Sequence, residues 1–392
     1  MRTPFDSPRQ FGRVLIKAIV LLIIFDATQI AFDLAGMLDG WRLYRSFTPL
    51  TERLGLANQI GDPIWWTIDP LLDAHQIAQP KAPDEFRVIF LGDSATFCLY
   101  CRSTEAIPSV FTQLDATFDG KRVVGYNLAY PGSDWMKDML ILKHALKYQP
   151  DAIVWLVTAK GAGDQPLPQE PDAHLIVRVN AAELPALSRQ FNIDTWETER
   201  YADADAWYQH SIFTHGGRYR DWLLLLVRSF RNALIYPNKD LTREYLLPGE
   251  PITTKPVPAI AEINSALPGY GTFPNRQWAL LRAGQQLAAE ADVPLLVVNE
   301  PIYLANGPNT DVNYNPFYER NLYDRFRAAL TGFTRQHAMA YLDLWNLLPA
   351  ENFSNTSLHY NLEGNRRIAQ ELLTTLSNAQ FTMHNSQFII EH

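Results

Sequence analysis

A serine in the first third of the chain and a histidine close to its end are the first candidates for chemistry. Ser94 stands in the segment VIFLGDSATF, in which an apolar run leads directly into Gly92, Asp93 and Ser94. A serine hydroxyl is a weak nucleophile and needs a base within hydrogen-bond reach. His359, in the segment NTSLHYNLEG, is the candidate base because an imidazole titrates near neutral pH. Together the two residues predict acyl transfer through a serine nucleophile.

Backbone amides near the same serine could stabilise the oxyanion of such a reaction. The N–H group of Ser94, at the start of a predicted helix, and that of Gly132, in the turn of the segment NLAYPG, are suited to this role. A glycine at position 132 also lets the backbone approach a substrate closely. Each feature has a plainer explanation: Ser94 as a helix N-cap, Gly132 as a turn residue, and His359 as a cap of the last helix.

An alternation of apolar strands and amphipathic helices would position these residues. Strands are expected at 87–91, 122–128, 152–158, 294–300 and 340–345, and helices at 104–117, 133–148, 276–291, 318–337 and 361–377. Short, continuously apolar strands separated by helices predict a parallel sheet that is covered on both faces. Ligands of such sheets bind beyond the carboxyl ends of the strands. The residues at or just beyond the ends of the predicted strands are Ser94, Asn127, Gly132, Thr158, Asn299 and Glu300.

The remaining segments surround this α/β domain, which we expect at 86–378. Residues 161–275 interrupt the alternation, are rich in Pro, Trp, Tyr and Asp, and contain one apolar helix near 221–235. We interpret this region as an insertion or cap over the edge of the sheet. Residues 41–85 are expected to form a connector, and residues 379–392 a C-terminal tail.

Composition excludes several classes of protein. With 47% hydrophobic and 19% charged residues the chain is expected to be globular, and a net charge of −8 gives no support for a nucleic-acid partner. Cys98 and Cys101 form a single C-x-x-C, which offers too few ligands for zinc, so a structural or incidental pair is expected. No metal or other cofactor is expected. The segments GYG and GAG lack the setting of a nucleotide-binding loop, and G-x-S-x-G is absent.

The N-terminal segment, residues 1–40, is predicted to be a signal anchor. Basic residues precede the apolar run AIVLLIIF, and a helix over 14–37 would be long enough to cross a bilayer. The basic residues predict that the N-terminus stays inside and that the bulk of the chain lies outside the cytoplasm. Asp26 and Asp33 oppose this, at about 2.5–3.5 kcal/mol for a carboxylate at mid-membrane. A cleaved signal peptide and an interfacial or core helix remain alternatives.

Three segments, FLGDSATF, NLAYPG and LHYNLEGNRRIAQEL, resemble three of the four sequence blocks of the SGNH/GDSL hydrolase superfamily. The resemblance implies a flavodoxin-like α/β/α sandwich with Ser94 as nucleophile, the Ser94 and Gly132 amides in the oxyanion hole, and His359 as base. Members include esterases, lipases and enzymes that add or remove acetyl groups on carbohydrates. Membrane-tethered relatives act on exopolysaccharide. The implied substrate is therefore an ester-bearing small molecule or cell-envelope carbohydrate.

The chain departs from the family pattern in two places. The third block, Gly-x-Asn-Asp, is replaced by LVTAKGAGD, so the donor supplied by its Asn would have to come from Thr158 or from Gln165 in the insertion. The acid expected three residues before the histidine is replaced by Thr356, with Asn355 before it. Loss of one oxyanion donor typically costs about 10²–10³ in rate. These departures leave open an inactive protein of the same fold, used as a binding or scaffold module in polysaccharide assembly.

Other polar residues are candidates for supporting roles. Glu300, at the end of the fourth predicted strand, and Asp93 are candidate acids that could orient the histidine, although Glu300 could also be a surface carboxylate before Pro301. Asn127 and the loop NTDVNYNPFYER are candidates for substrate binding. This loop carries Asn313, Tyr314 and Asn315, whose amides and aromatic ring suit sugar hydroxyls and ring faces, but an ordinary turn loop would explain them as well.

Overall fold

The sheet and its helices occupy the part of the chain that the computed structural model describes from residue 50 onward. The described residues are 8–32, 50–54, 68–73, 75–99, 101–162, 176–177, 180, 183–193, 275–306, 310–354 and 358–378. Helix α1, Pro8–Phe32, belongs to a separate compact unit and is treated by itself. The helix predicted near 221–235, the tail at 379–392 and most of the 41–85 connector lie outside the described residues.

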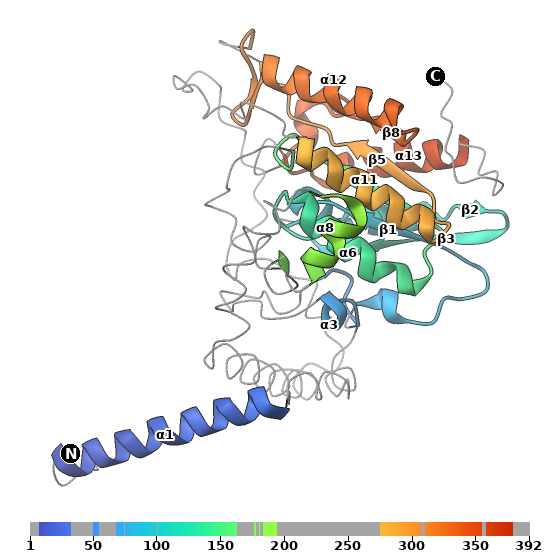
Figure 1. Ribbon diagram of the computed structural model, residues 1–392. Helices are drawn as coiled ribbons and strands as arrows, with labels where there is room; N and C mark the ends of the chain where they lie inside the picture. Colours follow the sequence, from blue (N-terminus) through green and yellow to red (C-terminus); the bar gives the residue numbers. More distant parts are fainter. Residues whose placement is uncertain are drawn as a thin grey trace. The chain divides into compact units, whose positions relative to one another are not determined.

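The central sheet has six strands in the order β2-β3-β1-β4-β5-β8 (Figure 1). Their bounds are β1 Glu85–Leu91, β2 Thr117–Phe118, β3 Lys121–Asn127, β4 Ala152–Val157, β5 Leu295–Asn299 and β8 Ala340–Asp343. Only β2 is antiparallel to its neighbour, and the other five strands are parallel. Without β2, the order is the flavodoxin-like 2-1-3-4-5. The predicted fold class and the five predicted strands are confirmed.

The alignment of the strands brings the candidate residues to one edge of the sheet. The register pairs Phe90 of β1 with Asn127 of β3 and Leu91 of β1 with Trp155 of β4. Further along the sheet, Val157 of β4 pairs with Asn299 of β5. Parallel strands in register end at the same edge, so the segments that follow them are neighbours. The central strands β1, β4 and β5 are buried throughout, which explains the continuous apolar runs in their sequences, and the two buried charges of β1, Glu85 and Arg87, pair with each other over 2.7 Å.

Helices cover both faces of the sheet (Figure 1). The described helices and 3-10 turns are α3 Ile68–Asp73, η3 Gln76–Ala78, α4 Ser94–Phe97, η4 Ser103–Glu105, α5 Ile107–Gln113, α6 Trp135–Ala145, η5 Leu146–Tyr148, α8 Leu184–Phe191, α11 Asn275–Glu290, α12 Arg320–Gln336, η8 Ala350–Asn352 and α13 Leu362–Asn378. Helices α5 and α13 share one hydrophobic core cluster with the sheet. On the other face, Trp278 of α11 has its ring centroid 5.7 Å from Trp135 of α6 and 6.4 Å from Phe326 of α12.

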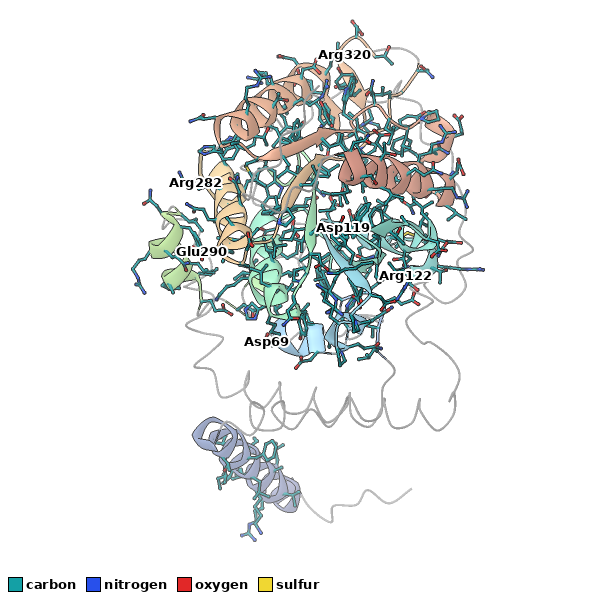
Figure 2. The ribbon with its side chains drawn as sticks, turned by 90° about the vertical axis from the view of Figure 1, so that its right-hand side faces the viewer. Asp69, Asp119, Arg122, Arg282, Glu290 and Arg320 are labelled. Carbon is teal, nitrogen blue, oxygen red and sulfur yellow. A yellow bond between two sulfur atoms is a disulfide. The ribbon has the colours of Figure 1, made fainter. Side chains whose placement is uncertain are left out.

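Several short elements were not predicted from the sequence. The hairpin of β6, Asn313–Asn315, with β7, Tyr318–Glu319, precedes α12, and α8 stands inside the predicted insertion. Helix α8 lies against α11, where Arg282 donates to the Phe191 carbonyl over 3.5 Å and Gln190 donates to Glu290 over 3.5 Å. Figure 2 shows Arg282 and Glu290 on the side of α11 that faces α8. At two to eight residues, β2, the hairpin strands and α8 are too short for a clear periodic pattern.

A cluster of charged side chains joins α3, α6 and α8. The two ring nitrogens of His144 lie 2.9 Å from Asp69 and 2.8 Å from Glu183, and Asp69 is labelled in Figure 2. Lys147 bonds Asp69 over 2.5 Å, and Lys143 pairs with Glu183. Burial by itself would lower the pKa of His144, but its hydrogen bonds to Asp69 and Glu183 raise that pKa to about 9. The histidine therefore carries a positive charge at neutral pH and holds three helices together.

We expect His144→Gln to lower the free energy of unfolding at pH 6 by about 1–2 kcal/mol. The effect is small because Asp69 is half exposed, and solvent screens its attraction to the imidazolium. Because the pKa is about 9 in the folded state and 6.5 in the reference state, the folded state binds the proton more tightly. The stabilisation is therefore complete below pH 6.5 and lost as pH rises through about 9. Urea unfolding at pH 6 and above pH 9 measures this difference. His337→Gln, directly after α12, is the control, and an equal deficit at both pH values would contradict the assignment.

Helix α1 covers most of the helix predicted at 14–37 within the proposed anchor, and residues 33–37 lie outside the described residues. Among the helices described, none is both long enough and apolar enough to cross a membrane. The anchor and the extracytoplasmic location stay predictions.

Candidate active site

Ser94 is the first residue of α4, directly beyond the carboxyl end of β1. The chain turns between the two elements at Gly92, where a Cβ atom would lie 2.7 Å from Oγ1 of Thr96. A residue with a side chain therefore does not fit there without displacing Thr96. Asp93 caps the helix, because its Oδ1 accepts a hydrogen bond of 2.9 Å from the Ala95 amide. Strand, glycine and cap together place the Ser94 side chain at the edge of the sheet.

Ser94 and His359 lie within hydrogen-bond distance of each other. The distance from Nε2 of His359 to Oγ of Ser94 is 2.9 Å, although the two residues are 265 positions apart in the chain. This separation is within the reach expected of a nucleophile and its general base. The geometry agrees with the roles predicted for both residues, which remain to be tested by chemistry.

A short antiparallel pairing holds the segment that carries His359. Phe353 bridges to Tyr360, and the Ser354 amide donates to the His359 carbonyl over 2.8 Å. The Asn361 amide in turn donates to the Asn352 carbonyl over 3.0 Å. The chain between the two arms contains Asn355 and Thr356, and both predicted residues lie outside the described residues. The backbone around the histidine is thus fixed immediately before α13.

Two amides at this edge are available to a substrate oxygen. In the described part of the chain, neither the N–H of Ser94 nor that of Gly132 has a hydrogen-bond partner. Gly132 has a φ of +95°, a conformation that favours glycine. The loops that carry the two amides are tied together, because Oδ2 of Asp93 accepts a hydrogen bond of 2.6 Å from Ser133. The arrangement suits an oxyanion hole, and Asp93 serves it as a cap and a tie between loops.

Thr158, the predicted replacement for the missing asparagine donor, follows β4 at the same edge and is 6% exposed. Its carbonyl accepts from the Gly161 amide over 3.1 Å. The alternative donor, Gln165, lies outside the described residues. Thr158 is therefore the candidate for a third donor within the described chain.

Glu300 lies beneath the serine–histidine pair and is only 2% exposed, so it is not the surface carboxylate considered as an alternative. Its Oε1 accepts a hydrogen bond of 3.0 Å from Thr96, and its Oε2 lies 3.5 Å from the hydroxyl of Tyr360. Burial first, and then the charge of Asp93, raise the pKa of Glu300 well above its usual value. The raised pKa favours the protonated form of Glu300. Its contacts link the nucleophile's helix to Tyr360, whose hydroxyl also donates to the Pro301 carbonyl over 2.9 Å, and among the described residues no hydrogen bond joins Glu300 to the imidazole.

Asn127 is the last residue of β3, and its side chain bonds the backbone of α4. Its Nδ2 donates to the carbonyls of Thr96 and Phe97 over 3.2 and 3.4 Å, and its Oδ1 accepts from the Ala129 amide over 3.3 Å. The side chain is 2% exposed. Both ends of the amide are engaged within the protein, which supports a structural role for the residue proposed to bind substrate.

Cys98 and Cys101 are joined by a disulfide with a Cα–Cα distance of 5.3 Å. Cys98 ends α4 in the left-handed conformation, with φ +65°. Asn365 of α13 lies against this loop, with Nδ2 3.5 Å from Sγ of Cys98 and 2.8 Å from the Glu105 carbonyl. The pair predicted to be structural or incidental therefore closes the end of the nucleophile's helix.

The loop proposed to bind sugars forms the β6–β7 hairpin. Oδ1 of Asn315 accepts from the amides of Phe317 and Tyr318 over 2.8 and 3.1 Å, and its Nδ2 donates to the Tyr303 carbonyl over 2.9 Å. Asn313 is 9% exposed and Asn315 is completely buried. The contacts of Asn315 favour the ordinary turn loop over sugar recognition for that residue.

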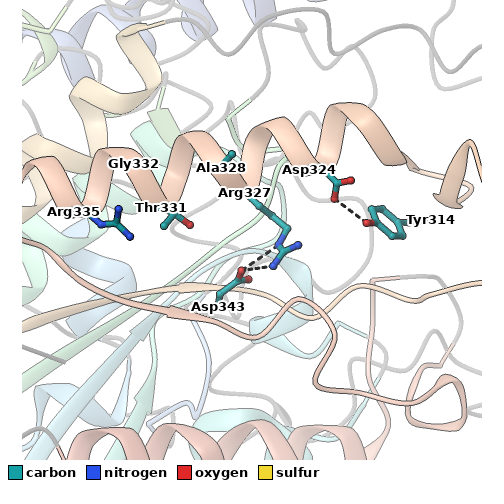
Figure 3. Close-up of a pocket in the computed structure, with 8 residues that line it drawn as sticks. All are labelled: Tyr314, Asp324, Arg327, Ala328, Thr331, Gly332, Arg335 and Asp343. Carbon is teal, nitrogen blue, oxygen red and sulfur yellow. Dashed lines mark hydrogen bonds and ion pairs between the residues drawn. The ribbon is translucent and has the colours of Figure 1, made fainter. Parts of the chain in front are cut away.

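Tyr314, in contrast, lines a surface pocket between α12 and the end of β8 (Figure 3). The other lining residues are Asp324, Arg327, Ala328, Thr331, Gly332, Arg335 and Asp343. Figure 3 shows Tyr314 bonding Asp324 and Arg327 bonding Asp343, with distances of 2.8 and 2.7 Å. This pocket is separate from the serine–histidine pair, and its two aspartates balance its two arginines.

Some residues of the site gave no signal in the sequence. Lys137 lies in a helix whose apolar spacing was recognised, yet its own side chain is completely buried and directed at the site loops. Thr96 and Tyr360 contact Glu300, but nothing in their neighbouring sequence marks them for this role. The one weak signal is the Lys137–Asp138 pair, two adjacent charges between apolar residues of α6. Among the described residues, no cluster of His, Cys, Asp or Glu could hold a metal ion.

The described chain is an α/β sandwich with a serine–histidine pair at the carboxyl edge of its sheet. No family model matches the sequence, and no curated protein matches it. Among solved structures, the chain matches a proposed acylhydrolase from Bacteroides fragilis NCTC 9343, at 11% identity and a TM-score of 0.37. That match covers 77% of this chain and 93% of the other. A similarity this low carries no argument about activity.

Proposed function

We propose that the protein is a serine esterase or O-acyltransferase of the SGNH type. The observation that carries the proposal is the 2.9 Å distance between Oγ of Ser94 and Nε2 of His359, beside the two unpaired amides of Ser94 and Gly132. A nucleophile, a base and oxyanion donors are the three parts that acyl transfer requires.

The reaction follows from these groups. His359 accepts the hydroxyl proton of Ser94 as Oγ attacks the ester carbonyl carbon, and the two amides stabilise the resulting oxyanion. Collapse of the intermediate breaks the ester bond, and the leaving alcohol takes the proton from His359. Water or an acceptor hydroxyl, deprotonated by His359, then attacks the acyl-enzyme and releases Ser94. Transfer differs from hydrolysis in which of the two nucleophiles reaches the acyl group.

The proposed substrate is an ester group on cell-envelope carbohydrate. Support comes from the resemblance of three segments to SGNH/GDSL hydrolases, some of which process acetylated carbohydrates, and from the predicted N-terminal anchor. The proposed location outside the cytoplasm rests on the same anchor. The disulfide between Cys98 and Cys101 is compatible with an oxidising compartment.

A fluorophosphonate probe tests the proposed chemistry. We expect the native chain to be labelled once, on the peptide that contains Ser94, because phosphonates react with serines that a neighbouring base activates. Heat-denatured chain should not be labelled, and Ser109→Ala, on α5, should be labelled like the native protein. Mass spectrometry of the digest locates the label. Native protein that stays unlabelled but retains glycan binding would contradict the proposal and favour the inactive binding module.

A further inference from the structure

Lys137 is a cation with no access to solvent, located on α6 behind the proposed oxyanion hole. Its side chain is completely buried, and its Nζ donates to the carbonyl of Gly92 over 2.9 Å and to the carbonyl of Tyr130 over 2.5 Å. Oδ1 of Asp138 lies 2.9 Å from Nζ and forms an ion pair with it. The partners of the ammonium group are therefore one neighbouring carboxylate and two backbone carbonyls from the site loops.

The two carbonyls occupy equivalent places in the two loops. Gly92 stands two residues before Ser94, and Tyr130 stands two residues before Gly132. In each loop, the peptide unit held by Lys137 is followed directly by the unit that carries the proposed oxyanion donor. Because each peptide unit is planar, only the φ and ψ angles of Asp93 or Pro131 separate each held unit from the donor unit. One ammonium group is thus bonded one residue away from both donors.

Further bonds tie together the two loops that carry these amides. The Tyr130 amide donates to the Gly92 carbonyl over 3.1 Å, so that this oxygen accepts bonds from both Tyr130 and Lys137. A second link follows, because Ser133 bonds Asp93 over 2.6 Å. The Gly132 amide therefore lies between two cross-links, the Ser94 amide directly follows both, and Lys137 forms the deeper link.

Simple packing does not explain a lysine at this position. Met136, Met139 and Leu140 on the same helix are buried, and an apolar side chain would fill the site without the cost of burying a charge. The nearest acid compensates only in part, because burial raises the pKa of Asp138 to about 7. A positive charge behind two peptide units also favours negative charge in front of them.

We propose that Lys137 is a positioning residue of the oxyanion hole, which holds the Ser94 and Gly132 amides at the spacing that an ester oxyanion requires. The inference rests on the proposed function. Lys137 touches neither the substrate nor the serine–histidine pair, so its removal should weaken oxyanion stabilisation and leave substrate binding intact.

The test uses p-nitrophenyl acetate as substrate and phenylboronic acid as an analogue of the tetrahedral intermediate, with the full chain. For Lys137→Met we expect kcat to fall about 10- to 100-fold, less than or comparable to the loss of one oxyanion donor. The inhibition constant of the boronate should rise by a similar factor, and KM should change less than about twofold. A residue with a merely structural role would alter stability without this separation of kcat from KM.

Three further variants serve as a fallback and as controls for Lys137→Met. Lys137→Met combined with Asp138→Asn leaves no unpaired buried charge, and the Asn oxygen can still accept the bond of 3.1 Å that Trp155 donates to Asp138. It is the variant to measure if Lys137→Met does not fold, and it should lose kcat to the same extent. Asp138→Asn alone keeps both carbonyl bonds and should stay near native kcat. Lys143→Met, the same change on the same helix, is the matched control and should have native kcat.

The outcomes separate this inference from the proposed function. If the native chain is active and the folded double variant keeps kcat and boronate affinity within about twofold, Lys137 does not position the oxyanion hole and the proposed function stands. A fall in kcat with unchanged boronate affinity would also overturn the inference. If the native chain neither hydrolyses the ester nor reacts with the phosphonate, the proposed function fails and the inference fails with it.

Discussion

Replacing Ser94 by alanine or His359 by glutamine should each lower kcat/KM for p-nitrophenyl acetate by about 10⁴-fold or more, and the double variant should be no worse than either. The two side chains, 2.9 Å apart, act in one step, since attack by Oγ and removal of its proton occur together. Once one partner is lost, the other has no remaining role in that step. Their effects should therefore not add.

Steady-state kinetics of the two single variants and of the double variant, with thermal melts to show that each is folded, measure this prediction. His337→Gln and Ser109→Ala replace the same residue types away from the site and should retain native turnover. Additive losses would indicate that Ser94 and His359 act independently. Native turnover in either single variant would remove that residue from the mechanism.

Substitutions of Glu300 should show whether this buried acid is a neutral link between two segments or an ionised acid that orients His359. We expect Glu300→Gln to keep kcat within about threefold, whereas Glu300→Ala should lower kcat about 100-fold and the free energy of unfolding by about 3 kcal/mol. Glutamine can still bond both Thr96 and Tyr360, as the protonated acid does. Alanine leaves Thr96 without that partner and removes the link between Thr96 and Tyr360, whose hydroxyl keeps only the bond of 2.9 Å that it donates to the Pro301 carbonyl.

An ionised Glu300 that orients His359 would give the opposite result for these two variants. If Glu300 were the ionised acid that orients His359, Glu300→Gln would remove its charge and lower kcat on the order of 10⁴-fold, as the equivalent change does in a serine protease. Kinetics of the two variants, each compared with its thermal melt, decide between the roles. A large loss in Glu300→Gln would overturn the assignment of Glu300 as a neutral link.

The pH dependence of the free energy of unfolding provides an independent measurement on Glu300→Gln. Since burial raises the pKa of Glu300 well above its reference value of 4.5, the folded state keeps this proton to a higher pH than the unfolded state does. Above pH 4.5 the unfolded state then binds fewer protons, so unfolding becomes easier by up to about 1.4 kcal/mol per pH unit as pH rises. Glu300→Gln should show a shallower fall than the native chain as pH rises from 4.5. The protons of Asp138 and His144 contribute a fall of the same sign, so only the difference between the two proteins is informative.

The residues at the carboxyl ends of the strands could be located from the sequence because parallel strands impose their own pattern. Strands β1, β4 and β5 are buried on both faces, so their apolar runs are continuous and their ends are visible. Position at a strand end, together with chemical type, was sufficient to select Ser94, Gly132 and His359. The same reasoning selected Asn127, whose amide instead holds the carbonyls of Thr96 and Phe97.

The partners of the buried polar groups could not be obtained in this way. Lys137 finds its carbonyls 45 and 7 residues away, and Thr96 meets Glu300 across 204 residues. Such pairings leave no periodic signal, because a single buried contact depends on where several loops come together in space. Glu300, read as a loop residue, was compatible with either a surface position or the site.

The local pattern of the sequence was thus sufficient to predict the sheet, its helices and the types of group at the edge of the sheet, because hydrophobic burial repeats along each element. The distance between the hydroxyl and the imidazole, the raised pKa of Glu300 and the contacts of Lys137 are set by the folded chain. Each depends on desolvation and on groups brought together from distant segments.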